Sequence, residues 1–251
     1  MNPFAVSSWS LDGMLNAGLP LLALPGAVRE HGLDLLELCH FHLPTTDDPY
    51  LRSVRRALDE AGVRLLTLLI DTGDIAAPDP GEREAEIQAI RRWLDIAAAL
   101  GAERARIVAG RQPPTPEVIE RSAAGLAALG AEATARGVRP ITENWLATGQ
   151  EPDALLAIIS RCGLGLCVDV GNAEATADKY ATIERLMPHA ASVHFKARYG
   201  PDGALELDDL RRSAALMRAS GFDGPISLIY QEKRDEWAGI ARLRAALEEA
   251  L

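Results

Sequence analysis

Residues 141–196 contain three short apolar segments, and each of them runs directly into polar residues. They read Ile141-Thr-Glu-Asn-Trp145, Leu166-Cys-Val-Asp-Val-Gly-Asn172 and Ser192-Val-His-Phe-Lys196. Side chains alternate across a strand, so successive parallel strands would bring Glu143, Asp169 and His194 together at one level. Two carboxylates and an imidazole suit a divalent metal ion of the hard to borderline type.

Outward from this stretch, strand-like and helix-like segments alternate along the whole chain. The other strand-like segments span residues 4–9, 33–38, 63–70, 104–109 and 225–230. The helix-like segments span residues 21–31, 50–61, 82–100, 115–136, 152–160, 175–187, 207–220 and 236–251. Eight alternating pairs predict a (β/α)₈ TIM barrel of the α/β class, with residues 1–251 as one domain. An open doubly wound sheet is the alternative, but no glycine-rich fingerprint follows the first strand.

Composition excludes several classes of partner. The 251 residues are 48% hydrophobic and 25% charged, as in one well-cored globular domain. A net charge of -10 argues against a nucleic acid or an anionic membrane as partner. Cys39, Cys162 and Cys167 lack metal-type spacing, and no signal peptide or membrane-length apolar run is present. We therefore predict a cytoplasmic protein with a small-molecule partner, and a homodimer is compatible with the sequence.

Polar residues follow the predicted strands, whereas the strand bodies are apolar. In TIM barrels the functional residues lie where the strands end, at the C-terminal rim. The residues at these exits include Glu37, Cys39, His40, His42, Asp71, Asp74, Arg106, Arg111, Tyr230 and Gln231. This clustering predicts a catalytic or binding site at the rim.

The motifs resemble those of a known family. Trp9-Ser-Leu, Leu36-Glu-Leu, Arg106-Ile-Val-Ala-Gly, Glu143-Asn, Val168-Asp-Val-Gly-Asn and His194-Phe-Lys occur in this order. The same order is seen in the xylose-isomerase-like barrels, the sugar phosphate isomerase/epimerase proteins, and the resemblance covers essentially the whole chain. It implies a role in carbohydrate metabolism.

The resemblance also implies a divalent ion, Mn or Mg rather than Zn, bound by a Glu, an Asp, a His and a second Glu. Glu143, Asp169 and His194 match the first three of these ligands. Ile229 stands at the position of the second Glu and cannot bind an ion. Gln231, on the same strand face, is the candidate replacement through its side-chain carbonyl. Occupancy of the metal site is therefore an open question at this stage.

The chemistry implied by the resemblance is removal of a proton from a carbon next to a carbonyl group, with the ion stabilising the enediolate. Glu143 is then the expected base and Lys196 or His194 the expected acid. Without the second Glu, isomerisation of a small keto sugar or related hydroxy-carbonyl compound is favoured over epimerisation. The alternatives are a lyase or dehydratase acting on a keto-inositol or keto acid, and a non-catalytic sugar-binding barrel that has lost its metal.

Further candidates for substrate contact are Trp9, Glu37, His42, Arg106, Trp145, Asn172 and Arg198. Several have an equally plain structural interpretation. Glu37 and Arg106 share the barrel interior, and we interpret them mainly as a buried ion pair. Trp9 and Trp145 are suited to stacking on a sugar or to filling the core. Arg198 suits an anionic substrate, although no glycine-rich phosphate loop follows the seventh or eighth strand.

Overall fold

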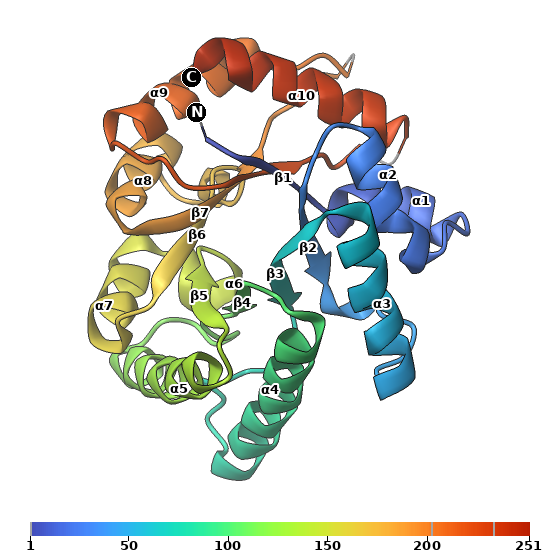
Figure 1. The fold of residues 1–251 in the computed structure, drawn as a ribbon. Helices are drawn as coiled ribbons and strands as arrows, with labels where there is room; N and C mark the ends of the chain where they lie inside the picture. The colour runs from blue at the N-terminus through green and yellow to red at the C-terminus, as the bar shows by residue number, and fades with distance from the viewer. Residues whose placement is uncertain (1, 202, 233) are drawn as a thin grey trace.

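The computed structural model describes residues 2–201, 203–232 and 234–251. Its centre is a closed barrel in which strands β1 to β8 pair in sequence order, all parallel (Figure 1). The strands are β1 Phe4–Ser7, β2 Leu35–Cys39, β3 Arg64–Ile70, β4 Arg104–Ile107, β5 Arg139–Glu143, β6 Gly165–Asp169, β7 Ala190–Lys196 and β8 Ile226–Ile229. The predicted (β/α)₈ TIM barrel is thereby confirmed.

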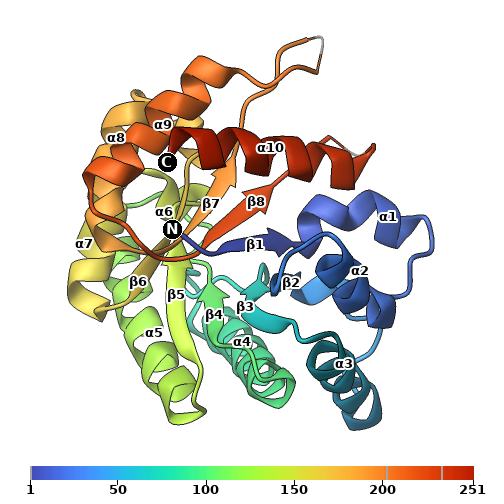
Figure 2. The same ribbon diagram turned by 45° about the horizontal axis from the view of Figure 1, so that its top comes forward.

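Helices form a ring around the barrel, and the N- and C-termini lie near each other on one side of it (Figures 1 and 2). The longer ones are α2 Leu24–Glu30, α3 Asp48–Ala61, α4 Pro80–Leu100, α5 Pro116–Ala135, α7 Pro152–Cys162, α8 Lys179–Leu186, α9 Leu207–Ala219 and α10 Glu236–Ala250. Two short helices, α1 Asp12–Asn16 and α6 Leu146–Gln150, lie in loops. The 3₁₀ turns are η1 Ser8–Leu11, η2 Leu21–Ala23, η3 His40–His42, η4 Asn172–Ala175 and η5 Met187–His189.

Local sequence signals begin and end these helices. Asp47, Asp79 and Thr115 each accept a hydrogen bond from a backbone N–H in the first turn of α3, α4 and α5 respectively. Gly62 and Gly101 end α3 and α4 in the left-handed conformation, with φ of 64° and 70°. The helices therefore start and stop close to the predicted residues.

The two faces of the strands carry different kinds of buried side chain. Outward-facing side chains pack against the helices in one large apolar core. Inside the barrel, Ala5, Leu35 and Leu66 form a small separate apolar cluster toward the N-terminal ends of the strands. Polar residues such as Glu37 and Arg106 occupy the inward positions above this cluster. The polar site is therefore enclosed by apolar layers on its sides and below.

The sequence expectation differs from the structure at the first strand. Trp9 lies in the 3₁₀ turn η1 instead of continuing the strand. The side chain of Ser7 accepts a hydrogen bond from the Trp9 backbone N–H, a local bond that competes with the strand ladder. The short helices α1 and α6 were also not predicted.

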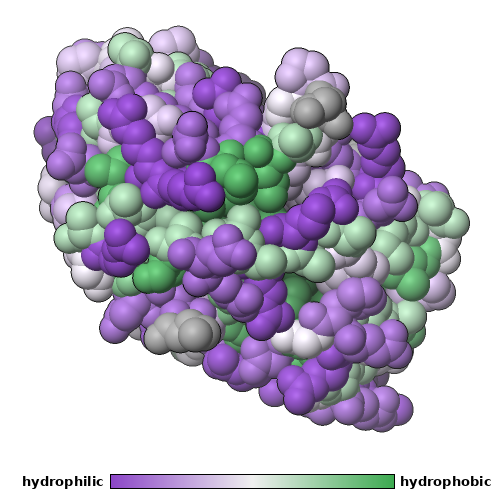
Figure 3. All heavy atoms as spheres, turned by 90° about the horizontal axis from the view of Figure 1, so that it is seen from above, coloured by the Kyte–Doolittle hydropathy of each residue, from purple (hydrophilic) through white to green (hydrophobic). Residues whose placement is uncertain are grey.

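The outer surface is mainly polar. On the face shown in Figure 3 hydrophilic side chains predominate, interrupted by small apolar groups. Leu22, Phe41 and Leu207 are exposed large hydrophobic residues. In the part of the chain that the structure describes, every helix is too short or too polar to cross a membrane.

Candidate active site

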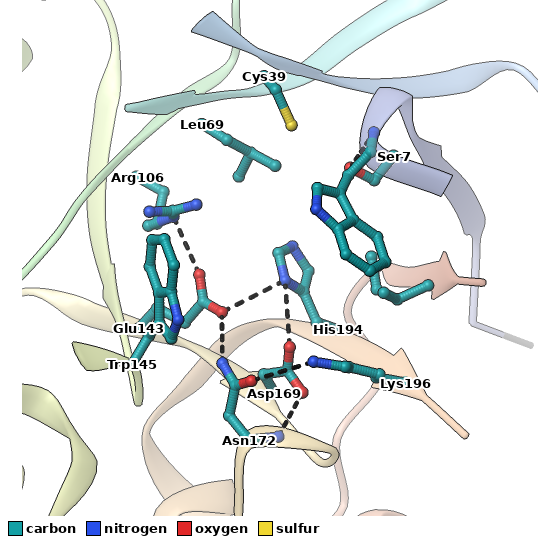
Figure 4. A pocket seen from close by; sticks show the side chains of 12 residues that line it. Ser7, Cys39, Leu69, Arg106, Glu143, Trp145, Asp169, Asn172, His194 and Lys196 are labelled. Atoms are coloured by element: carbon teal, nitrogen blue, oxygen red, sulfur yellow. Dashed lines mark hydrogen bonds and ion pairs between the residues drawn. The ribbon is translucent and has the colours of Figure 1, made fainter. Parts of the chain in front are cut away.

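A cavity of about 150 Å³ opens at the C-terminal rim of the barrel (Figure 4). It is lined by Ser7, Trp9, Cys39, Leu69, Arg106, Glu143, Trp145, Asp169, Asn172, His194, Lys196 and Ile229. These residues come from strand ends and from the turns that follow them. Their position is that of the functional site in TIM barrels.

The strand register brings the three central polar residues together. Asp169 on β6 is directly opposite His194 on β7, and Glu143 on β5 is opposite Cys167 on β6. His194 Nδ1 lies 3.6 Å from Glu143 Oε1 and 3.9 Å from Asp169 Oδ2. The three residues face one another, but only Asp169 and His194 share a level in the register, because Glu143 is level with Cys167, two residues before Asp169.

Glu143 is held as a permanent anion. Its Oε2 lies 2.9 Å from Arg106 Nε, and its Oε1 accepts a hydrogen bond of 3.1 Å from Asn172 Nδ2. Burial alone would raise the pKa of Glu143, but the charges of Arg106 and His194 outweigh it and lower the pKa to about 2. A carboxylate this acidic suits charge stabilisation and ion binding.

Asp169 has the opposite electrostatic character. Its Oδ1 accepts hydrogen bonds from the backbone N–H groups of Gly171 at 2.7 Å and Asn172 at 2.8 Å. Its Oδ2 is left facing His194. Burial, followed by the negative charge of Glu143, raises the pKa of Asp169 to about 6. Asp169, unlike Glu143, therefore has a pKa that suits proton exchange near neutral pH.

We expect Asp169→Asn to stabilise the metal-free protein at alkaline pH. The pKa of Asp169 rises on folding from 3.8 to about 6, so the folded protein binds this proton more tightly than the unfolded chain does. The resulting contribution to the free energy of unfolding is complete below pH 3.8 and is lost as the pH rises through about 6. A shift of this size corresponds to at most about 3 kcal/mol. Thermal melting in chelator should show a higher melting temperature for Asp169→Asn at about pH 8 and a shrinking difference toward about pH 5. A difference that does not change with pH would contradict this assignment.

The buried ion pairs differ from the sequence prediction. Glu37 was expected to pair with Arg106, and this prediction is wrong. Glu37 Oε2 instead lies 2.8 Å from His194 Nε2, whereas Arg106 pairs with Glu143 and with Asp71. The reason is the register, which places Arg106 level with Leu69 and Cys39, one inward layer above Glu37.

The Glu37 contact fixes the orientation and charge of His194. Burial lowers the pKa of His194, but Cys167, Glu37 and Glu143 together raise it well above the ordinary value. Glu37 is fully buried, and its pKa stays low because His194 and the hydroxyls of Thr67 and Ser227 outweigh its burial. The Glu37 carboxylate holds Nε2, so Nδ1 is the nitrogen that faces the cavity.

Glu143 and His194 lie close enough to hold a divalent ion together, and Asp169 Oδ2, 3.9 Å from His194 Nδ1, is a further candidate ligand beside them. Glu143 Oε1, Asp169 Oδ2 and His194 Nδ1 face one another, and Glu37 supports His194 in the way that carboxylates support metal-binding histidines. Cys167 is a further neighbour, because its Sγ and ligand atoms of Glu143 and His194 all lie within 4.8 Å of one another. Burial raises the pKa of the Cys167 thiol to about 11, so it is a poor ligand for Mn²⁺ or Mg²⁺.

The residue at the position where the sequence resemblance implies a fourth protein ligand is apolar. Ile229 lines the cavity and offers no donor atom, and Gln231 is exposed and outside the set of lining residues. The structure thus does not bring Gln231 to the other ligand candidates. An ion at this site would have three protein ligands and positions open to water or substrate.

The remaining predicted site residues divide into two groups. Trp9, Trp145, Asn172 and Lys196 line the cavity with Arg106. His42, Glu37 and Arg198 do not line it. The ring of His42 is bonded to Ser8 and Asp12, and Arg198 lies near Glu174 and Glu206 on the exposed surface.

Sequence reasoning did not single out Ser7, Leu69 and Cys167 as site residues. Strand parity could have found Leu69 and Cys167, since Cys167 is two residues before Asp169 on the same face. The ion pair between Asp71 and Arg106 was also missed, because Asp71 follows β3 in a turn-like sequence.

The fold and its rim cavity define an α/β barrel with a charged, enclosed site for a small ligand. Residues 25–250 match the family described as xylose isomerase-like TIM barrel, and the chain belongs to this family.

A curated relative from Homo sapiens, described as a putative hydroxypyruvate isomerase, is 25% identical over 257 residues and covers 90% of each chain. Among solved structures, an L-ribulose 3-epimerase has a TM-score of 0.79 at 19% identity, covering 100% of this chain and 96% of the other. A D-tagatose 3-epimerase-like protein has a TM-score of 0.77 at 19% identity, covering 99% and 98%. At this level of identity the structural likenesses show the fold alone.

Proposed function

We propose that this protein is an isomerase that acts on a small hydroxy-carbonyl compound by moving a proton between neighbouring carbon atoms. The observation that carries the proposal is the juxtaposition of Glu143, Asp169 and His194 in an enclosed cavity at the barrel rim. The family and the names of the similar proteins, which are sugar epimerases and a putative hydroxypyruvate isomerase, agree with this reaction class.

The reaction needs a base, an acid and a counter-charge. A base removes the proton from the carbon that bears the hydroxyl group, and the electron pair passes to the carbonyl oxygen to form an enediolate. The same proton, or one from solvent, is then added to the former carbonyl carbon, and the hydroxyl proton moves to the other oxygen. The net change is redox-neutral. The protein must place proton-transfer groups within hydrogen-bond reach of both carbons.

The residues of the cavity can fill these roles. Asp169, with its pKa of about 6, is better suited by its pKa to take the carbon-bound proton, and Glu143, with its pKa of about 2, is suited to hold positive charge beside the reacting carbons. His194 and Lys196 place N–H donors on the same side of the cavity, where they can stabilise the enediolate oxygens. A divalent ion held by Glu143, Asp169 and His194 would supply Lewis-acid stabilisation of that negative charge.

A dehydratase is the second candidate, because the same enediolate can expel a neighbouring hydroxyl as water. Ile229 favours these one-sided reactions over epimerisation, since it leaves the last strand without a second acid–base group at the cavity. This placement supports isomerisation or elimination within the wider isomerase/epimerase class.

Mass spectrometry of reaction mixtures tests the proposal. The protein is incubated with small ketoses, keto-inositols and hydroxy-keto acids, with and without Mg²⁺. We expect a product of the same mass as its substrate, which chromatography separates from it. A product lighter by one water would establish the dehydratase instead. If no compound is converted although several bind, the chain is a binding protein and the proposal is wrong.

A further inference from the structure

Most charged groups at the cavity already have a partner of opposite charge or a full set of hydrogen bonds. Arg106 lies between Glu143 and Asp71, and His194 is bonded to Glu37. The Oδ1 atom of Asp169 accepts two backbone N–H groups. The charges and hydrogen-bonding atoms of these residues therefore already have protein partners before any substrate binds.

Lys196 is the exception. Its Nζ donates to the side-chain carbonyl of Asn172 at 3.4 Å and lies 5.8 Å from the ring centre of Trp9 (Figure 4). Among the residues that the structure describes, no carboxylate forms a direct ion pair with this ammonium group, although its positive charge acts at longer range to lower the pKa of both Glu143 and Asp169. The other described lysine, Lys179, instead holds Asp209 at 2.7 Å and Glu174 at 3.0 Å. An ammonium group carries three donors, so Lys196 has unused hydrogen-bonding capacity directed at the cavity.

The structure holds this ammonium group in place. A Cβ atom on Gly171 would lie 2.7 Å to 2.8 Å from three carbon atoms of the Lys196 side chain, so the absence of a side chain at Gly171 lets the lysine pack there. The Asn172 amide donates to Glu143 and accepts from Lys196, which fixes its own orientation. The lysine is therefore positioned before the substrate binds, and binding costs less side-chain entropy.

We propose that Lys196 binds a carboxylate group of the substrate, so that the substrate is a hydroxy-keto acid of about three or four carbon atoms. This inference rests on the proposed function for the identity of the reacting group, but the anion-binding role of Lys196 stands apart from turnover. The carboxylate lies against Nζ, and the carbonyl and hydroxyl carbons extend toward His194 and Glu143.

Size and charge favour a carboxylate over a phosphate. The cavity of about 150 Å³ is small compared with the roughly 300–1,000 Å³ typical of small-molecule sites. The other arginines near the rim already have partners. Arg111 donates to the backbone carbonyl of Asp71, and Arg198 lies near the carboxylates of Glu174 and Glu206. One lysine in a small cavity matches one carboxylate.

Calorimetric titration with a matched pair of probes tests the proposal. Hydroxypyruvate and dihydroxyacetone share a ketone and a hydroxymethyl group and differ by a carboxylate in place of a second hydroxymethyl. The titrations are made in chelator, so that no ion binds the keto acid, and are repeated with Mg²⁺. The variants are Lys196→Met, Lys196→Arg as the charge-conserving change, and Lys179→Met as the control for the same loss of charge outside the cavity. Melting curves verify that each variant is folded.

We expect wild type to bind hydroxypyruvate at least about tenfold more tightly than dihydroxyacetone. Lys196→Met should weaken hydroxypyruvate binding by about 10- to 100-fold and change dihydroxyacetone binding by less than about twofold. Lys196→Arg and Lys179→Met should keep most of the preference for hydroxypyruvate over dihydroxyacetone. Equal binding of the two probes by wild type, absence of hydroxypyruvate binding, or an equal loss for both probes in Lys196→Met would overturn the proposal. Selective binding of the acid without any conversion would uphold this role of Lys196 and overturn the proposed function.

Discussion

Replacement of Glu143 by Gln is expected to lower turnover by at least about a hundredfold, the usual contribution of a positioned acid–base or charge-stabilising group. Gln keeps the shape and the hydrogen-bonding oxygen of Glu but lacks its charge and basicity. Glu143 Oε1 lies 3.6 Å from His194 Nδ1, in the centre of the group of polar residues that line the cavity. The expected loss is the same whether Glu143 acts as the base or holds an ion. Steady-state kinetics on the identified substrate measures the effect.

Loss of stability must be separated from loss of chemistry in this variant. Glu143 is one partner of a buried pair with Arg106, and removal of one partner of such a pair is costly. Asp71→Asn is the matched control, because Asp71 is the other carboxylate on Arg106 and does not line the cavity. It should lower the melting temperature while reducing turnover much less than Glu143→Gln. Near-normal turnover in Glu143→Gln would remove Glu143 from the mechanism.

Ile229→Glu is expected to tighten divalent metal binding by about a hundredfold, since affinity for hard cations rises with the number and charge of oxygen ligands. Ile229 lines the cavity at the end of β8, and Lys196 on β7 is its partner in the register. A carboxylate at this position would join Glu143, Asp169 and His194 around the same space. Metal titration followed by calorimetry, with Mn²⁺ and Mg²⁺, measures the change.

The same substitution should destabilise the protein when no metal is present. Ile229 is 5% exposed, and a third carboxylate would be buried near Glu143 and Asp169, a cost that an ion pair with the neighbouring Lys196 offsets only in part. A cost of about 3 kcal/mol corresponds to a melting temperature lower by roughly 6–12 °C for a chain of this size. We expect the melting temperature to fall in chelator and recover with Mn²⁺, whereas Ile229→Leu should respond as wild type does. Equal Mn²⁺ affinity in wild type and Ile229→Glu would show that the fourth ligand position lies elsewhere.

Much of the fold could be predicted because the signals are local. The apolar strands and the glycines after several helices follow from backbone preferences, and strand parity alone placed Glu143, Asp169 and His194 on the inner face. The short helices α1 and α6 were missed because each has only five residues, too few to show a helical period.

The ion pairs of the site could not be predicted from parity. Parity shows that Glu37 and Arg106 both point inward, but the level of each depends on the register between strands. The β2–β3 pairing contains a register shift between Leu36 and Glu37, and the sequence pattern does not predict this shift. The partners of Glu37 and Arg106 therefore became evident only in three dimensions, as did the absence of a direct ion pair on Lys196 among the described residues.

Solvent deuterium exchange shows whether the rim cavity moves a carbon-bound proton. Wild type, Glu143→Gln and heat-inactivated protein are incubated in deuterated water with small hydroxy-keto compounds, with and without Mg²⁺, and followed by proton NMR. With wild type we expect the signal of the hydrogen on the carbon next to the carbonyl to disappear, at a rate at least about a hundredfold above that with Glu143→Gln. Binding of these compounds by wild type, with neither exchange nor conversion faster than in the heat-inactivated sample, would contradict this proposal.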